Sequence, residues 1–253
     1  MISRARPLLG TFVCIRTDGD EPAIRAAFRA IETVQRLMNV HSGESDLARI
    51  NRGAHRRAIC VHPWTYQVLA IARRISDASG GAFDVTLGRH GARHTDVDLQ
   101  DANRVRLRRT ARLDLSGIAK GFAVDKAVEA LRRHHARQGS VNAGGDLRVF
   151  GDEVQDLRVR VPHAPHLTLP LPSTREGAFA TSGNYFGSSL RDPRSGSETG
   201  VEESITVGAP SCVVADALTK VVAAAGPKRE LLRHFNAVAF LVDRNGTLYA
   251  ARS

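Results

Sequence analysis

Apolar residues recur at helical spacing in three long stretches of this chain. Glu21–Met38 carries an apolar residue at every third or fourth position, which predicts an amphipathic helix. Pro63–Ala78 opens with a proline and is followed by Gly80-Gly81, a pattern typical of the two ends of a helix. Cys212–Ala225 predicts an apolar helix, and a shorter helix is expected over Pro227–Phe235.

Short apolar runs between these stretches predict strands. The first is expected over Leu8–Arg16, and Ser140–Phe150 is expected to be a strand broken by Gly144-Gly145-Asp146. Asn245-Gly246 favours a tight turn in a closing hairpin. Because strands and helices mix without regular alternation, the pattern favours an α+β fold. Further strands are expected over Ala58–Val61, Val154–Leu171, Ala178–Tyr185, Glu203–Ala209, Ala237–Arg244 and Leu248–Ala251, with short turns at Ser45 or Asp46, Phe83–Leu87 and Leu190–Ser195, and a polar loop up to Arg104.

The segment Leu113–Asp125 combines an apolar run, a turn of small residues and the start of a helix. Leu113–Leu115 predicts a short strand, and Ser116-Gly117 predicts a turn. A strand that leads through a glycine turn into a helix leaves backbone N–H groups unpaired at the helix start, and such groups bind phosphate. Lys120 and Asp114 add a cation and an acid at the same place. This segment therefore predicts an anion site.

The charge balance is strongly basic, but it excludes little by itself. The 253 residues carry 36 lysines and arginines against 26 aspartates and glutamates, which gives a formal net charge of +10. All but four of these basic residues are arginines, and they are scattered singly or in pairs. No nucleic-acid-binding module is recognisable, and aromatic residues that could stack on bases are few. We therefore expect no nucleic-acid partner.

The N-terminal residues and the cysteines bear on location. No apolar run approaches the roughly 18 residues that a membrane span needs, and the patch Pro7–Cys14 is too short for a secretory signal and has no cleavage site after it. Cys14, Cys60 and Cys212 are widely spaced and odd in number, which favours thiols in a reducing compartment over disulfides or a zinc site. A cytoplasmic location is expected, without a membrane span.

Six turns combine small residues with an acid or a hydroxyl, and each alone is ordinary turn chemistry. In the last of them Asp216 lies within the apolar helix, with Thr219 and Lys220 three and four residues further on. One interpretation is a local ion pair between Asp216 and Lys220. The other is a metal or phosphate site, because oxygen ligands suit a hard cation such as Mg²⁺. The six turns are Gly80–Asp84, Asp114–Gly121, Gly144–Asp146, Thr181–Gly183, Asp192–Gly196 and Ala215–Lys220.

Taken in order, eight segments of the chain resemble the ApbE family. The resemblance extends from about Leu9 to Val222 and is specific because the whole series occurs in sequence. It implies an α+β fold of mixed sheets flanked by helices, and one domain over residues 1–253. The segments are LLGTF, MNVHSGESDLARIN, GGAFDVTLG, LDLSGIAKGFAVDKA, NAGGDLRVFG, ATSGNYF, DPRSG and SITVGAPSCVVADALTK.

ApbE proteins are FAD:protein FMN transferases, so the resemblance implies an enzyme activity. Such an enzyme binds FAD with Mg²⁺, moves the FMN half onto a Ser or Thr hydroxyl of a target flavoprotein and releases AMP. Phosphoryl transfer of this kind requires in-line geometry and neutralisation of charge on the pyrophosphate. Glycine turns allow backbone N–H groups to approach the phosphates.

The resemblance also assigns site residues by position. The metal ligands are the Gly117 carbonyl and Asp216, with Thr219 at a further helix position. The flavin contacts are Leu9, where a Met is usual, His41, where a Tyr is usual, and Ala82, Phe83, Asp84, Asp114, Lys120 and Arg191.

Two positions depart from the family pattern. Ser189 stands where a His is usual, and a serine hydroxyl is too weak a base to take the proton of the target hydroxyl. Lys220 stands where a Thr metal ligand is usual, and an ammonium cannot ligate Mg²⁺. Lys220 either supplies part of the metal's charge, paired with Asp216 or a pyrophosphate oxygen, or marks a metal site that has decayed. In both cases Mg²⁺ binding is expected to be weakened.

These departures leave alternatives to transfer. A flavin-binding relative with lost or altered chemistry, such as a flavin carrier or a slow FAD pyrophosphatase, needs no base that orients a target protein. A basic protein-interaction module would use the +10 surface for an acidic partner and would bind no flavin.

Overall fold

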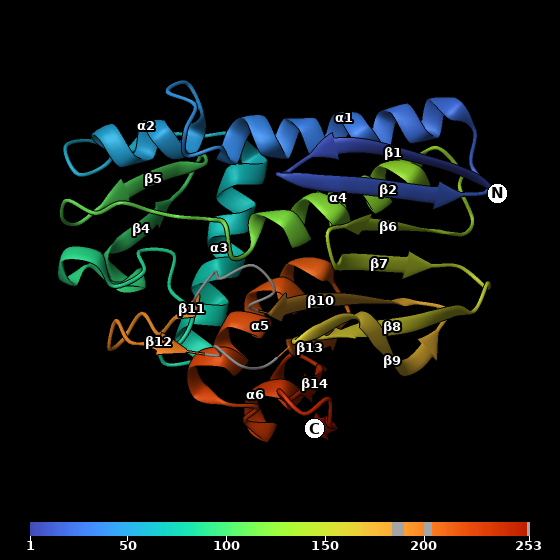
Figure 1. Cartoon of the computed structure of the whole chain (residues 1–253). Helices are drawn as coiled ribbons and strands as arrows, with labels where there is room; N and C mark the ends of the chain where they lie inside the picture. Colours follow the sequence, from blue (N-terminus) through green and yellow to red (C-terminus); the bar gives the residue numbers. More distant parts are fainter. Residues whose placement is uncertain (184–189, 200–203, 252–253) are drawn as a thin grey trace.

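The largest sheet is built from short strands, and buried and exposed positions alternate along its second strand, β2. There, Val13 and Ile15 are fully buried, whereas Cys14 between them is exposed. The computed structural model describes residues 1–183, 190–199 and 204–251 (Figure 1). Eight antiparallel strands pair in the order β1-β2-β6-β7-β10-β13-β14-β15. Their bounds are β1 Ile2–Leu8, β2 Thr11–Thr17, β6 Gly139–Ala143, β7 Asp146–Phe150, β10 Gly177–Gly183, β13 Ser204–Ala209, β14 Val238–Val242 and β15 Leu248–Ala251.

Three helices, α1 (Glu21–Met38), α4 (Ala119–Arg133) and α5 (Cys212–Ala225), pack beside one another on one side of this sheet (Figure 1). Asp20 caps α1 by accepting the Ala23 N–H. Helix α5 contacts α4 and the strands β10 and β13. Because it is covered from several directions, α5 buries polar residues along with its apolar ones, and the polar residues must find partners inside the protein.

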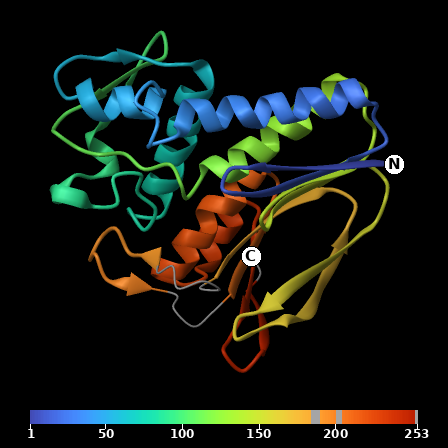
Figure 2. The same cartoon turned by 45° about the horizontal axis from the view of Figure 1, so that its top comes forward.

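A smaller group of elements lies at the end of α1. A three-stranded antiparallel sheet has the order β3-β5-β4, and α3 connects this region to α1 and α5. The hairpin of β8 and β9 packs on the other side of the large sheet, away from α5, as Figure 2 shows. The bounds are α2 Asp46–Gly53, β3 Ile59–Cys60, α3 Pro63–Ala78, η1 Arg89–Gly91, η2 His94–Asp96, β4 Val97–Gln100, β5 Arg104–Leu107, β8 Gln155–Val161, β9 Ala164–Thr174, β11 Leu190–Arg191, β12 Glu198–Thr199 and α6 Arg229–His234.

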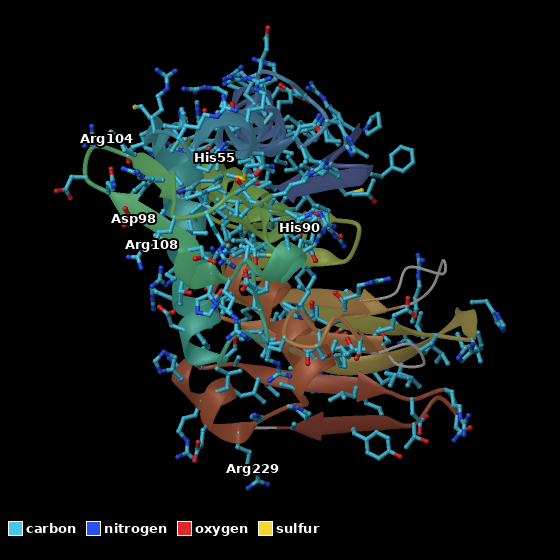
Figure 3. The ribbon with its side chains drawn as sticks, turned by 90° about the vertical axis from the view of Figure 1, so that its left-hand side faces the viewer. His55, His90, Asp98, Arg104, Arg108 and Arg229 are labelled. Atoms are coloured by element: carbon cyan, nitrogen blue, oxygen red, sulfur yellow. The ribbon has the colours of Figure 1, made fainter. Side chains whose placement is uncertain are left out.

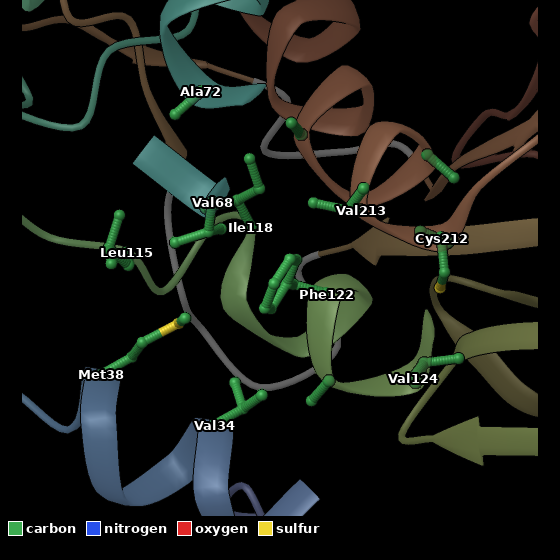
Figure 4. Packing of buried hydrophobic residues seen from close by; sticks show 14 of the residues in the cluster. Val34, Met38, Val68, Ala72, Leu115, Ile118, Phe122, Val124, Cys212 and Val213 are labelled. Carbon is green, nitrogen blue, oxygen red and sulfur yellow. The ribbon is translucent and has the colours of Figure 1, made fainter. Parts of the chain in front are cut away.

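Most of these elements meet in one cluster of buried residues from Val13 to Ala239, whereas the β8–β9 hairpin packs on β14 in a second, smaller cluster. Phe122 of α4 lies near its centre, with Val34 of α1 and Val213 of α5 on two sides of it (Figure 4). Phe122 is 1% exposed, so its ring is removed from water almost completely. This packing holds the start of α4 against α5, and both helices contribute residues to the candidate site described below.

The expected α+β class is confirmed, and the three long helices have the bounds that their periodicity predicts. The interrupted strand Ser140–Phe150 is also confirmed as β6 and β7 around Gly144-Gly145, and the closing hairpin is present as β14 and β15. These elements could be predicted because the periodicity and the turn residues that define them are local properties of the sequence.

Other expectations for the strands are wrong. The expected strand Leu8–Arg16 contains a turn, because Leu9 and Gly10 have φ values of 56° and 72° and reverse the chain between β1 and β2. Leu113–Leu115 is extended but is not a strand, since the Leu113 N–H donates to the Asn51 side chain. Val154–Leu171 is a hairpin, and the polar loop up to Arg104 contains β4 and the start of β5. The turn at Ser45 opens a full helix, α2.

Surface charge is spread over several elements. In Figure 3, Arg104 at the start of β5 and Arg108 just after its end lie along the same edge of the molecule as Asp98 of β4, whereas Arg229 lies at the far end on α6. No helix among the described residues is both long enough and apolar enough to cross a membrane. Cys14, Cys60 and Cys212 are all free thiols, and only Cys212 is buried.

Candidate functional site

Two cavities meet at the segment that leads into α4. The first has a volume of about 380 Å³ and is lined by the β1–β2 turn, the end of α1 and the loop after it. The second has a volume of about 570 Å³ and is lined by parts of residues 82–89 and 190–196, and by Lys220. Asp114, Ser116 and Lys120 line both cavities, so a ligand with two parts could fill them together.

The first cavity is mostly apolar. Leu9 enters it from the β1–β2 turn, and His41 borders it from the loop after α1. The turn is held because the Leu9 N–H donates to Gln35 Oε1 at 2.7 Å, although Leu9 itself has an unfavourable positive φ. A planar aromatic ring suits such an apolar slot with a few polar groups at its rim.

The second cavity contains more charged groups. Ala82, Phe83 and Asp84 line it together with Gly117 and Lys220. The Asp84 carboxylate is itself engaged, because Oδ1 accepts the Thr86 N–H and hydroxyl and Oδ2 accepts the His94 N–H. Arg191 reaches the cavity with an exposed side chain 3.8 Å from Glu198. The structure therefore brings together all eight of the residues expected to contact the flavin.

Lys120 stands where the cavities join, and a buried acid faces it. Its ammonium lies 3.2 Å from Asp146 Oδ2. These atoms are not aligned for a hydrogen bond, and Asp146 Oδ2 is a buried oxygen without a hydrogen-bond partner in the described part of the chain. Burial acts to lower the pKa of Lys120, but Asp146 and Asp216 outweigh it and raise that pKa above its usual value. Lys120 is thus held as a cation.

Asp146 is only 1% exposed. Burial, aided by the charge of Asp216, raises the pKa of the Asp146 carboxyl to about 7, while Lys120 and Lys220 partly offset the increase. Two carboxylates and two ammonium groups therefore form a cluster beneath the cavities, which we call the four-charge cluster: Lys120, Asp146, Asp216 and Lys220.

Asp216 is fully buried, and both of its carboxylate oxygens have partners. Oδ1 lies 2.5 Å from Lys220 Nζ, and Oδ2 accepts the Gly121 N–H at 3.0 Å. Of the two interpretations that the helical spacing allowed, the local ion pair is present. One of the first N–H groups of α4, expected to be available for phosphate, is instead used by Asp216.

The expected metal ligands lie close together, but their polar atoms are engaged. Thr219 is fully buried, and its hydroxyl donates to the Asp216 carbonyl at 2.7 Å. The Lys220 stem lies against Gly117, where an added Cβ would be 3.5 Å from Lys220 Cε. Among the residues described, no three His, Cys, Asp or Glu side chains are grouped to hold a metal ion. Mg²⁺ therefore does not fit these residues as they are arranged.

Two polar residues of the site were not expected to take part. Ser182 of β10 accepts a hydrogen bond from Lys220 at 3.1 Å, and Asp146 faces Lys120. Both stand in small-residue turns of the sequence, but turn chemistry gives no information about contacts with residues far along the chain. Ser189, expected at the position of the base, lies outside the described residues.

Comparisons with known proteins place this site in a family. The profile of the ApbE family matches residues 9–242. A FAD:protein FMN transferase of Treponema pallidum is 26% identical, with 93% of this chain and 82% of that protein aligned. One from Chlamydia trachomatis is 25% identical, with 90% and 84% aligned.

Solved structures agree in fold. The crystal structure of the ApbE protein from Thermotoga maritima matches with a TM-score of 0.83 at 24% identity, covering 99% of this chain and 96% of that one. The flavin transferase ApbE from Vibrio cholerae matches with a TM-score of 0.83 at 20% identity, with 99% and 96% covered. Because the family profile spans nearly the whole chain and carries the segments that line both cavities, this chain belongs to the ApbE family.

Proposed function

We propose that this protein is an FAD:protein FMN transferase. It binds FAD, moves the FMN half to a Ser or Thr hydroxyl of a target flavoprotein, and releases AMP. The observation that carries the proposal is the pair of cavities that meet at Lys120, in a chain whose family relatives bear that activity in their names. The main hydrophobic cluster runs from Val13 to Ala239, and β14 joins it to the second cluster, which supports treating residues 1–253 as a single catalytic domain.

The two cavities suit the two parts of a dinucleotide. The apolar cavity at Leu9 and His41 accepts a ring system, and the diphosphate then lies near Lys120. Gly117 lines the second cavity without a side chain, and an added Cβ would lie 3.4 Å from the Phe83 ring, so its backbone can approach a ligand. Arg191 adds a second cation at the far side.

The transfer forms one bond and breaks one. The acceptor oxygen bonds to the phosphorus of the FMN half, and the P–O bond to the AMP half breaks with its electron pair on the leaving AMP phosphate. The proton of the acceptor hydroxyl passes to solvent water. Negative charge on the phosphoryl oxygens is offset by ammonium groups that the four-charge cluster already holds in place, which is the form of stabilisation that contributes most to such reactions. Mg²⁺ does not fit the ligands as they are arranged, so the positive charge comes from the ammonium groups of Lys120 and Lys220.

Incubation with FAD and an acceptor protein that carries a flavinylation motif tests the proposal. We expect fluorescent flavin on the acceptor in a denaturing gel, and AMP in the supernatant. Lys120→Met should lower the rate by roughly 100-fold or more, as loss of one charge-stabilising donor does elsewhere. Lys228→Met is the matched control, because Lys228 is exposed and lines neither cavity.

Two outcomes would contradict the proposal. FMN and AMP released without labelled acceptor would indicate a pyrophosphatase. Absence of FAD binding would exclude any flavin-dependent activity of this protein.

The cytoplasmic location is also a proposal, and fractionation of the native host would test it.

A further inference from the structure

We propose that the ammonium group of Lys220 is the resident cation of this site, so that the protein holds the diphosphate of a dinucleotide without a divalent metal ion. The inference rests on the proposed function for the identity of the ligand. It concerns a residue at which this chain departs from its family, and its tests include two that need no flavin.

The ammonium occupies the position that a metal ion bound by Asp216 would need. Lys220 Nζ lies 2.5 Å from Asp216 Oδ1 and donates to Ser182 Oγ at 3.1 Å. The other carboxylate oxygen, Oδ2, accepts the Gly121 N–H at 3.0 Å. A carboxylate with both oxygens engaged in this way has its charge balanced by groups of the protein itself.

The contacts, and not the helical spacing alone, make Lys220 the cation at Asp216. Residues three and four apart on a helix both lie on one face, so the spacing allows either Thr219 or Lys220 to stand beside Asp216. Lys220 is four residues after Asp216 and lines the larger cavity, with its side chain 21% exposed. Thr219 is fully buried and directs its hydroxyl to the Asp216 carbonyl.

The Lys220 stem also fills the space beside Gly117, the residue whose carbonyl is expected to be a metal ligand. An added Cβ on Gly117 would lie 3.5 Å from Lys220 Cε and 3.6 Å from Lys220 Cγ. A hydrated Mg²⁺ needs near-octahedral oxygen ligands at about 2.0–2.1 Å. A metal ion could enter only if the stem and the ammonium moved away, so the ion would have to replace Lys220 as the partner of Asp216.

The cluster presents two ammonium groups to a ligand. Lys120 lies beside Asp146, and Lys220 beside Asp216, in the protein alone. Both lysines line the second cavity, where a phosphate group can meet two point charges at once. The partly exposed Lys220 can therefore contact a ligand and Asp216 together.

Binding measurements with and without chelator test the inference directly. FAD is titrated into the wild-type protein in EDTA and in Mg²⁺, and the dissociation constants are compared. We expect them to agree within about twofold, well below the tenfold change that corresponds to 1.4 kcal/mol. Lys220→Thr should bind FAD at least about tenfold more weakly in EDTA and recover in Mg²⁺. Lys228→Thr changes the same residue type at an exposed position and should behave as wild type.

Two further measurements need no flavin. Titration with Mn²⁺, followed by electron paramagnetic resonance, should detect no bound ion in wild type and one bound ion in Lys220→Thr. Thermal unfolding of wild type should be the same in EDTA and Mg²⁺, whereas the melting temperature of Lys220→Thr should rise when Mg²⁺ is added.

The outcomes separate this inference from the proposed function. If wild type binds Mn²⁺, or loses FAD affinity by about tenfold in EDTA, the inference is overturned even if Lys220→Thr does not fold. If wild type binds no FAD in either buffer, the proposed function fails, and the Mn²⁺ and melting measurements still decide the role of Lys220.

Discussion

Removal of the Asp125 carboxylate should destabilise the protein strongly, because this side chain caps a helix other than its own. Ser211 precedes α5 but makes no side-chain capping bond. Asp125 of α4 instead accepts the N–H groups of Cys212 and Val213, each at 2.9 Å. It also pairs with Arg148 at 2.5 Å, and its side chain is 7% exposed. The first turn of α5 therefore depends on a carboxylate from another helix.

The expected loss follows from these contacts. Loss of a capping side chain costs about 0.5–2 kcal/mol, and removal of one partner from a buried ion pair costs about 3–5 kcal/mol. Because the two effects share one carboxylate, we expect Asp125→Ala to lower the free energy of unfolding by about 4 kcal/mol rather than by the sum. With a urea m-value of about 3 kcal/mol per M, the midpoint should fall by roughly 1.3 M.

Urea unfolding followed by circular dichroism measures this loss. Glu176→Ala is the control, since Glu176 pairs with Arg132 on the surface with its side chain 58% exposed, and such pairs contribute about 0–1 kcal/mol. Asp125→Asn keeps an oxygen for the helix N–H groups and should lose less than Asp125→Ala. If Asp125→Ala costs no more than Glu176→Ala, the capping argument is refuted.

Three further changes probe the packing and electrostatics of the site. Asp146→Asn should flatten the pH dependence of stability between about pH 4 and 7. In the folded wild type the pKa of the Asp146 carboxyl is about 7, whereas its usual value is 3.8. The folded state therefore binds more protons than the unfolded state in this range, and wild-type stability falls as the pH rises. Equal slopes in urea unfolding of the two proteins would contradict the raised pKa of Asp146. Gly121→Ala would put a Cβ 2.2 Å from the Cys212 carbonyl oxygen, and should lower the free energy of unfolding by about 1–3 kcal/mol because α4 and α5 must move apart. Gly43→Ala is its control, since the Cβ there would meet nothing nearer than 3.5 Å. Equal urea midpoints for the two variants would refute the close approach. Leu9→Gly relieves the φ of 56° but also removes packing of the Leu9 side chain against the core, so the free energy of unfolding should change by less than about 1 kcal/mol. FAD binding should weaken, and unchanged affinity in a fluorescence titration would show that Leu9 does not contact the ligand.

Candidate site residues could be predicted from the sequence where they stand in recognisable turns. The segments at Ala82–Asp84 and Asp114–Lys120 do line one cavity, together with Arg191. The sequence did not reveal that Asp84 is engaged by its own loop, or that Asp146 faces Lys120. Those facts depend on side-chain contacts that composition and spacing do not contain.

The sequence by itself determined the three long helices, the closing hairpin and the family. Helical periodicity and turn residues act over a few neighbours, so they can be read locally. The spacing of Asp216 and Lys220 allowed either an ion pair or a metal or phosphate site, and it did not choose between them. The same local reading failed at Leu9, where a tight turn interrupts an apolar run.

Only the tertiary structure decided what the buried polar groups do. Gly121 and Asp216 are 95 residues apart in the chain, yet the Gly121 N–H donates a hydrogen bond to a carboxylate oxygen of Asp216. Asp125 likewise caps a helix that begins 87 residues later. A buried carboxylate must be paired by whatever donors the packing brings to it. The packing of α4 against α5 brings an amide N–H and the Lys220 ammonium to Asp216, so the choice between a metal ligand and an ion pair was made by the fold.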